Sequence, residues 1–407
     1  DTQGEKFWYY HTRAEDFPYH RTTLAVHLGR WLSLLMAAVT IMLTYATAVE
    51  LLPDHTPVAS LAAVIVAFNP GFLFIGAQIN NDNLCNLLGA ATLYLLARLW
   101  QRGFSLRLSI GLGFICGLLA LTKLNGLLIP PVIAIIAFVC ATKHHAWKEF
   151  ITLGFTCVGL TVLIAGWWYW RNFQLYGDPF AMEIRQSFTT TRSLTYWQVL
   201  QEYWGFHISY WGVFGLSNII LPNWTYQVYA VLSWLSIAGL TIWTWKCGRG
   251  AFRALALPLV HASIVLVGTL DVMRIFSGPG ARYTYIAIAA YSFLAAIGLL
   301  AVVPHRWHRQ TAVVLATGMV IIAFAAPYAV IRPVYARALS RPPLARDGIT
   351  VQYPLQAYLG NKVKLHGFDV NSTAAADMQV TLHWEVRERS DENLIVFVHL
   401  FDAQGEF

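Results

Sequence analysis

Charged residues are scarce in this sequence of 407 residues. Only 12% of the residues are Asp, Glu, Lys or Arg, whereas 57% are hydrophobic, and soluble domains typically carry about 25% charged residues. This balance excludes a single soluble core. The apolar residues fall in blocks of about 17–24, the length that crosses roughly 30 Å of hydrocarbon at about 1.5 Å per residue. The sequence therefore predicts a polytopic α-helical membrane protein.

Metal-ligating and redox motifs are also missing. The five cysteines lie within or at the ends of apolar blocks without C-x-x-C spacing, so we interpret them as packing residues. We interpret His144, His145, His305 and His308 as cytoplasmic-side charges and not as a metal cluster, and we expect no structural metal. The net charge of +7 is spread over short clusters between the apolar blocks, which indicates membrane orientation and no nucleic-acid partner.

We expect about ten membrane-spanning helices. The predicted spans are residues 31–52, 57–78, 83–100, 107–122, 125–141, 150–170, 226–246, 253–270, 283–303 and 311–332.

Positive charge predicts the orientation of these spans. Alternate short connections hold ten Lys and Arg residues, and the intervening ones hold three; the positive-inside rule assigns the first set to the cytoplasm. We therefore expect residues 1–30, the long loop 171–225 and everything after 332 to lie outside. The ten are Arg98, Arg102, Arg107, Lys143, Lys148, Lys246, Arg249, Arg253, Arg306 and Arg309.

The pattern of the chain changes outside the membrane. Loop 171–225 is rich in Tyr, Trp and Phe, which favours a position along the outer membrane surface or over a cavity. After about residue 340, runs of period two at 362–368, 380–386 and 394–401 predict antiparallel strands. We expect three parts: the end of an external loop (1–30), a membrane domain (31–335), and a partial antiparallel β-sandwich (345–407).

Asp82 is the sharpest candidate for chemistry. It lies at the outer end of two predicted helices in the run Asn80-Asn81-Asp82-Asn83. A carboxylate near hydrocarbon is costly and is a functional candidate by default, able to accept a proton or bind a cation. The alternative is helix capping, since Asn and Asp satisfy free backbone N–H groups at a helix start.

Basic residues stand near the same predicted outer end. Lys123 follows a spanning helix and suits a lipid phosphate as a point charge, or it extends to the membrane interface. Arg282 and Tyr283 follow Gly278-Pro279-Gly280, where they can contact a phosphate or anchor a helix. Arg171 leaves the sixth predicted span and is a second phosphate candidate, while Asp178 is a turn residue.

These segments together resemble a known family. Residues 68–82, 121–123, 171–179 and 281–283 are similar in order and outer-face placement to the GT-C glycosyltransferases. Within that superfamily the chain resembles the bacterial dolichyl-phosphate-mannose protein mannosyltransferase and aminoarabinose-transferase group, which uses polyprenyl-phosphate sugars. Residues after about 358 resemble the accessory β-sandwich that often follows such membrane domains.

The resemblance implies a reaction and a place. It implies inversion at a sugar anomeric carbon at the outer face of a bacterial cytoplasmic membrane, with an outer-face carboxylate as base or metal ligand. Asp82 would be the catalytic residue, and Lys123, Arg282, Tyr283, Arg171 and Asn81 would bind the lipid phosphate or substrate. The acceptor is open between protein, lipid and glycan, and no cofactor is expected unless a divalent cation takes part.

Where the sequence begins and ends affects the expected set of catalytic residues. Members of the family carry their principal acid in the first external loop, and we expect that loop to be cut here, with the chain also ending within a strand pattern. The fragment would then lack the principal catalytic acid. Glu15-Asp16 is a weaker candidate for that role, because it lies only about fifteen residues before the first predicted span.

Two other function classes compete with a transferase. A transporter or lipid-linked-sugar flippase would also use about ten helices, but the ionisable residues cluster at one face, not at a midplane. A scaffold that displays the β-domain would leave Asp82, Lys123 and Arg282 without a shared purpose. The transferase hypothesis predicts that these three residues line one outward-facing cavity.

Overall fold

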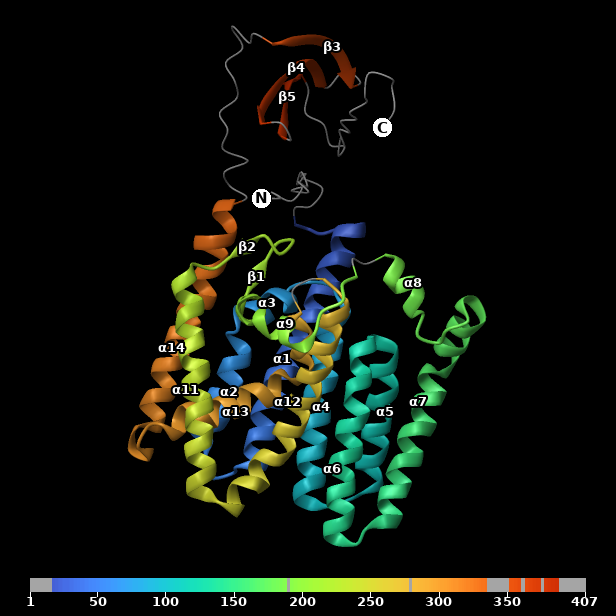
Figure 1. Ribbon diagram of the computed structural model, residues 1–407, viewed down its shortest axis with the longest axis vertical. Helices are drawn as coiled ribbons and strands as arrows, with labels where there is room; N and C mark the ends of the chain where they lie inside the picture. The colour runs from blue at the N-terminus through green and yellow to red at the C-terminus, as the bar shows by residue number, and fades with distance from the viewer. Residues whose placement is uncertain are drawn as a thin grey trace. The chain divides into compact units, whose positions relative to one another are not determined.

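The computed structural model describes residues 17–188, 191–277, 280–334, 351–359, 363–374 and 377–387. The chain divides into two units: residues 27–336 form one, and residues 1–26 with 337–407 form the other. The larger unit is helical (Figure 1).

The first half of the helical unit contains three long helices and several shorter ones. The elements are α1 (Arg21–Leu51), α2 (Thr56–Ala67), α3 (Pro70–Gly76), α4 (Asn81–Arg102), α5 (Leu106–Thr122), η2 (Leu124–Leu128), α6 (Ile129–His144) and α7 (Trp147–Tyr176).

The second half begins with the short elements of the predicted external loop. They are α8 (Met182–Ser187), α9 (Tyr196–Gln201), α10 (Tyr203–Trp211) and the antiparallel pair β1 (Val213–Phe214) and β2 (Ile219–Ile220). The remaining elements are α11 (Asn223–Cys247), α12 (Arg249–Ile275), η3 (Ala281–Ala287), α13 (Ile288–Ala301), η4 (His305–Trp307), α14 (His308–Ala325) and the π-helix η5 (Ala326–Ile331).

All ten predicted spans coincide with helices, which confirms a membrane helical bundle. By length and composition, seven helices of the described chain can cross a membrane, or eight if the bent pair α2 and α3 is one span. The prediction of ten is too high by this measure for two reasons. α5 has only 17 residues, and α4 carries polar residues through its first two turns, including Asp82, Asn83 and Asn86.

The bend between α2 and α3 has a local cause. Pro70 cannot donate a backbone hydrogen bond and so favours the first position of a new helix. Asn69 caps that helix, because its side-chain oxygen accepts from the Phe72 backbone N–H at 3.0 Å. The two helices meet at 60°, which brings the polar segment 77–81 back to the start of α4.

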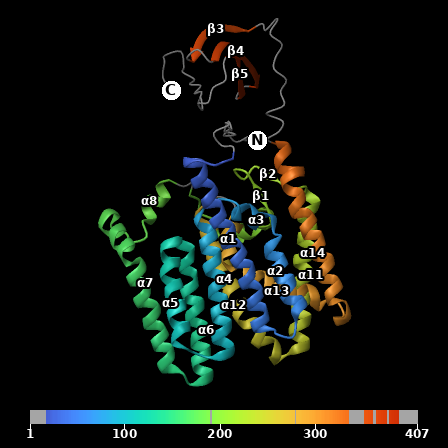
Figure 2. The same ribbon diagram turned by 180° about the vertical axis from the view of Figure 1, so that it is seen from behind.

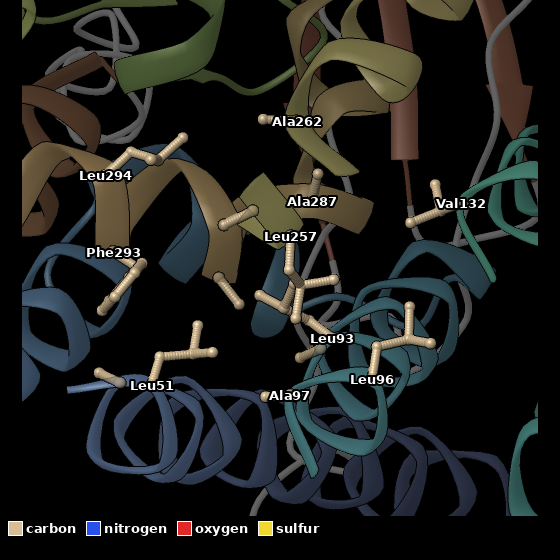
Figure 3. Packing of buried hydrophobic residues seen from close by; sticks show 14 of the residues in the cluster. Leu51, Leu93, Leu96, Ala97, Val132, Leu257, Ala262, Ala287, Phe293 and Leu294 are labelled. Atoms are coloured by element: carbon tan, nitrogen blue, oxygen red, sulfur yellow. The ribbon is translucent and has the colours of Figure 1, made fainter. Parts of the chain in front are cut away.

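The core of the bundle lies where α4, α6, α12 and α13 meet (Figure 3). Leu93 and Leu96 of α4, Leu257 of α12 and Phe293 of α13 are fully buried there. Glycines let the helices approach closely: a Cβ on Gly239 of α11 would lie 1.9 Å from the Gly298 carbonyl oxygen of α13. Small residues at such crossings are typical of membrane helix packing.

α5 and α6 lie beside α7, and α7 is the most exposed of these helices (Figures 1 and 2). Only 11% of the most apolar stretch of α7 is buried. Phe155, Leu163 and Trp170 are among its exposed apolar side chains. Such a surface suits hydrocarbon and not water.

The other unit contains a three-stranded antiparallel sheet in the order β3-β4-β5. Its strands are β3 (Tyr353–Leu359), β4 (Val363–Ala374) and β5 (Asp377–Val386). This confirms the antiparallel strands predicted at 362–368 and 380–386, and β3 is an additional one. The strand predicted at 394–401 lies outside the described residues, as do Glu15 and Asp16.

Two cross-strand pairs of histidine and carboxylate join β4 to β5. The His383 Nε2 atom lies 2.7 Å from Asp369, and the His366 Nε2 atom lies 2.8 Å from Glu385. A hydrogen bond from the Gln352 backbone N–H, and then one from His383, lowers the pKa of Asp369. The hydrogen bond from His366 lowers the pKa of Glu385.

These pKa shifts predict loss of sheet stability in acid. A carboxylate whose pKa is lower in the folded chain stabilises that fold above its unfolded pKa of about 4, and the contribution is lost as pH falls through the folded value. Hydrogen exchange corrected for intrinsic rates should therefore show weaker protection of β4 and β5 amides at about pH 3 than at about pH 6. Asp369→Asn should reduce this difference, whereas equal protection at both pH values would contradict the expectation.

Candidate functional site

Lys123 and Asp82 form an ion pair at one end of the bundle. Lys123 is an extended residue between α5 and η2, and the Gly126 backbone N–H donates to its carbonyl oxygen at 2.9 Å. Only glycine fits at 126, because a Cβ there would lie 2.7 Å from the Leu119 carbonyl oxygen. The Asp82 side chain is 9% exposed and that of Lys123 is 18% exposed. The pair is therefore held in a tight turn and largely shielded from solvent.

The asparagines around Asp82 make the hydrogen bonds that hold this segment in place. Asn80 is the N-cap of α4 and accepts from the Asn83 backbone N–H at 3.2 Å. Asn83 donates to the Gln78 carbonyl at 2.9 Å, and Asn81 donates to the Thr122 carbonyl at 2.9 Å. Since Asn80 provides the cap, Asp82 is left for Lys123. Asn81, predicted as a substrate contact, ties α4 to the end of α5 and is exposed.

Tyr283 brings a second cation close to this pair. Its ring centre lies 4.5 Å from the Lys123 Nζ atom and 5.5 Å from the Arg282 guanidinium carbon. Asn125 holds the backbone in place by donating to the Tyr283 carbonyl oxygen at 3.3 Å. Both cations thus face one aromatic ring, an electrostatically favourable contact.

Lys123 and Arg282 nevertheless open into different hollows. Lys123 and Arg171 line a hollow of about 400 Å³, whereas Arg282 lines a smaller one of about 80 Å³ with Gln78 and Tyr285. The predicted common cavity is therefore wrong in this respect. Arg282 and Tyr283 are neighbours in a 3₁₀-helix, where successive side chains project about 120° apart, so they face different spaces.

The hollow beside Lys123 combines cations with an apolar rim. Arg171 lies over the Trp168 ring at 5.4 Å, and Tyr169 donates to the Ala120 carbonyl at 2.7 Å. Arg185 of α8 also lines this hollow. The apolar lining residues include Leu121, Phe180 and Ile184. Such a space can accept an anionic group that carries a hydrocarbon chain.

Metal-ligating side chains are few around Asp82 in the described part of the chain. Among the described residues, no group of three His, Cys, Asp or Glu side chains comes together. The Asp82 carboxylate faces an ammonium group, and the amides of Asn81 and Asn83 donate to backbone carbonyls. The Asp82 carboxylate is therefore paired with a cation of the chain itself.

The predicted external loop is fastened to the end of α12. Arg192 pairs with both oxygens of Glu202 at 2.6 and 2.8 Å and donates to the Met273 carbonyl. Arg274 donates to Asp271 and to the Leu194 carbonyl, each at 3.0 Å. Arg274 therefore serves the loop and not the ion pair at Lys123.

Buried and turn-forming residues complete the attachment of this loop. Asp178 accepts from the Phe180 and Met182 backbone N–H groups at 2.9 and 2.6 Å, which confirms it as a turn residue. Burial lowers the pKa of His207 in α10, so its ring is neutral near pH 7. Its Nε2 atom lies 3.0 Å from the Tyr226 carbonyl oxygen.

Sequence reasoning missed three residues that build the site. Tyr169 lines the hollow, Asn125 positions Tyr283, and Tyr285 donates to the Tyr210 carbonyl at 2.5 Å, tying η3 to α10. The position of Asn125 beside Lys123 was a usable signal. Tyr169 and Tyr285 gave none, since tyrosines in apolar helices most often anchor them at the interface.

Comparisons with known proteins bear on the first part of the chain. Residues 26–170 match the family model described as dolichyl-phosphate-mannose-protein mannosyltransferase. This confirms the resemblance over a segment that includes Asp82 and Lys123 and ends just before Arg171.

A solved structure is also similar. The crystal structure of ArnT from Cupriavidus metallidurans in the apo state matches at 16% sequence identity with a TM-score of 0.49. The match covers 73% of this chain and 50% of that one, so this chain spans about half the length of that relative. No curated protein matches the sequence.

Proposed function

We propose that the chain is a membrane glycosyltransferase that moves a sugar from a polyprenyl-phosphate carrier to an acceptor at the outer face of a bacterial cytoplasmic membrane. One observation supports this most directly: Lys123, paired with Asp82, opens with Arg171 into a hollow of about 400 Å³ at the end of an apolar bundle. The match of residues 26–170 to the mannosyltransferase family supports the same class.

The hollow suits the two parts of such a donor. Lys123 would meet the carrier phosphate as a point charge, and Arg171 would bind two of its oxygens at once. Arg171 has no ion pair within the described part of the chain, so it needs no release before binding. The apolar rim at Leu121 and Ile184 would receive the first isoprene units of the carrier.

The chemistry follows from the same residues. An acceptor oxygen attacks the anomeric carbon, the bond from that carbon to the phosphate oxygen breaks, and the phosphate keeps the electron pair. Lys123 and Arg171 stabilise the charge that develops on the phosphate. Asp82 takes the proton of the acceptor once Lys123 turns to the phosphate. Because the acceptor attacks the face opposite the departing phosphate, the configuration at the anomeric carbon is inverted.

A transporter or flippase is the rival function. That reading expects two broken helices at corresponding positions of two halves. Among the helices that the structure describes, one pair, α2 and α3, is bent in this way. The ionisable pair lies at helix ends and not at the middle of a span, which favours a transferase.

Arg171 provides a test that does not disturb the ion pair. Arg171→Gln should raise the KM for a polyprenyl-phosphate sugar about tenfold with a smaller change in kcat, because the side chain contacts the bound phosphate. The measurement is release of polyprenyl phosphate by the purified protein in detergent or liposomes. Arg107→Gln, an exposed arginine at the far end of α5, should behave like the unmodified protein. Equal KM values for the two variants would remove Arg171 from the donor site.

A further inference from the structure

A third hollow lies at the opposite end of the bundle from Lys123. It has a volume of about 450 Å³ and lies between α4, α6, α11 and α12. Its lining includes Trp100, Ile135, Val139, Ala256 and Leu259. We call it the lower groove. The Thr244 hydroxyl, one of its few polar groups, donates to the Thr241 carbonyl at 2.8 Å, so the lining presents apolar surface.

The depth of the lower groove is that of one membrane leaflet. Its lining on α12 runs from Phe252 to Val260, a rise of about 12 Å at about 1.5 Å per residue. A leaflet is half of the roughly 30 Å hydrocarbon core. Phe252 is 64% exposed and Leu259 is 44% exposed, which a water-facing surface would not favour. The groove therefore matches a single hydrocarbon chain in dimension and polarity.

The mouth of the groove is basic. Lys143 at the end of α6 lies with its Nζ atom 5.9 Å from the centre of the Trp100 ring. Lys246 lies in the last turn of α11 and Arg253 in the second turn of α12, next to the lining residue Phe252, and both are exposed. Within the described chain, none of these three cations pairs with a carboxylate. Basic pockets between membrane helices bind anionic lipid headgroups.

We propose that the lower groove binds an anionic phospholipid, with one acyl chain between α6 and α12 and the headgroup phosphate at Lys143. The charge at the mouth complements a phosphodiester, and the lining complements the chain. This site is independent of the proposed transfer reaction, since it lies about 27 Å along α4 from Asp82 to Trp100 at about 1.5 Å per residue.

Native mass spectrometry of the purified protein tests the proposal. After delipidation, phosphatidylglycerol and phosphatidylcholine with the same acyl chains are added in turn. We expect phosphatidylglycerol to remain bound preferentially and Lys143→Gln to lower this preference about fivefold. Lys148→Gln changes an exposed lysine in the first turn of α7, whereas Lys143 contacts the lining residue Trp100, so it should leave the preference unchanged.

Filling the groove gives a second measurement. Ala256→Phe and Val139→Phe place a ring where the acyl chain would lie, so each should reduce retention of both lipids while the Tm of the protein shows that it is folded. Equal retention of the two lipids, equal effects of Lys143→Gln and Lys148→Gln, or undiminished binding by both folded groove-filling variants would overturn the proposal. Dimer formation in place of lipid retention would assign the groove to a second copy of the chain and also overturn it.

Discussion

Replacing Lys123 with alanine is expected to lower the rate of sugar transfer by about 100-fold or more, mainly in kcat. A fixed cation at a departing phosphate stabilises charge that exists chiefly in the transition state, and loss of one such group typically costs about 10²–10³ in kcat. The measurement is single-turnover transfer from a polyprenyl-phosphate sugar with saturating donor. Asp82→Asn should also cost about 100-fold, because an amide cannot accept the proton.

The double variant separates two roles for Asp82. If the carboxylate only holds Lys123 in position, adding Asp82→Asn to Lys123→Ala changes nothing further. If Asp82 is also the base, as proposed, the double variant is slower than either single variant. Arg107→Gln serves again as the matched charge-loss control. Unchanged turnover in both single variants would remove the ion pair from the mechanism.

Gly89→Ala is expected to destabilise the protein by about 1–3 kcal/mol, the usual cost of overpacking a core. A Cβ at position 89 would lie 1.9 Å from the Ile286 carbonyl oxygen, so α4 and η3 must separate. Because η3 carries Tyr283 and Arg282, the same shift loosens the aromatic contact of Lys123. Thermal unfolding in detergent and the transfer assay should therefore both show a loss.

A matched substitution isolates this packing effect. Gly154 lies inside α7, and a Cβ there would meet nothing within 4 Å. Gly154→Ala should be neutral or slightly stabilising, since alanine favours a helix over glycine by about 1 kcal/mol. A Tm for Gly89→Ala equal to that of Gly154→Ala would contradict the close contact between α4 and η3.

Much of the helical architecture followed from the length of the apolar blocks. Those blocks placed every long helix, because hydrocarbon imposes a minimum length on a spanning segment. They could not reveal the bend at Asn69 and Pro70, since a proline at a helix start and a proline in a kinked span look alike. The strand β3 was also missed: Tyr353–Leu359 contains a proline, which weakens a strand pattern.

The candidate site was predictable in its members but not in its geometry. Costly charges at apolar helix ends singled out Asp82 and Lys123, and the structure joins them in one ion pair. No sequence rule gave that pairing, because the two residues are 41 positions apart and meet only through the packing of α4 against α5. The sequence likewise could not predict that Lys123 and Arg282 line separate hollows, because this separation depends on the 3₁₀ conformation of η3.

The Tyr285 hydroxyl couples the movement of α10 to that of η3. Its hydrogen bond to the Tyr210 carbonyl, together with the contact between the Tyr210 and Tyr285 rings, joins α10 to η3, and the Tyr285 ring is buried. Whatever displaces the aromatic segment Tyr203–Trp211 also pulls on the helix that bears Tyr283. Under the proposed function, an acceptor that displaced this segment would therefore shift Tyr283, and its contacts with Lys123 and Arg282, in the same movement.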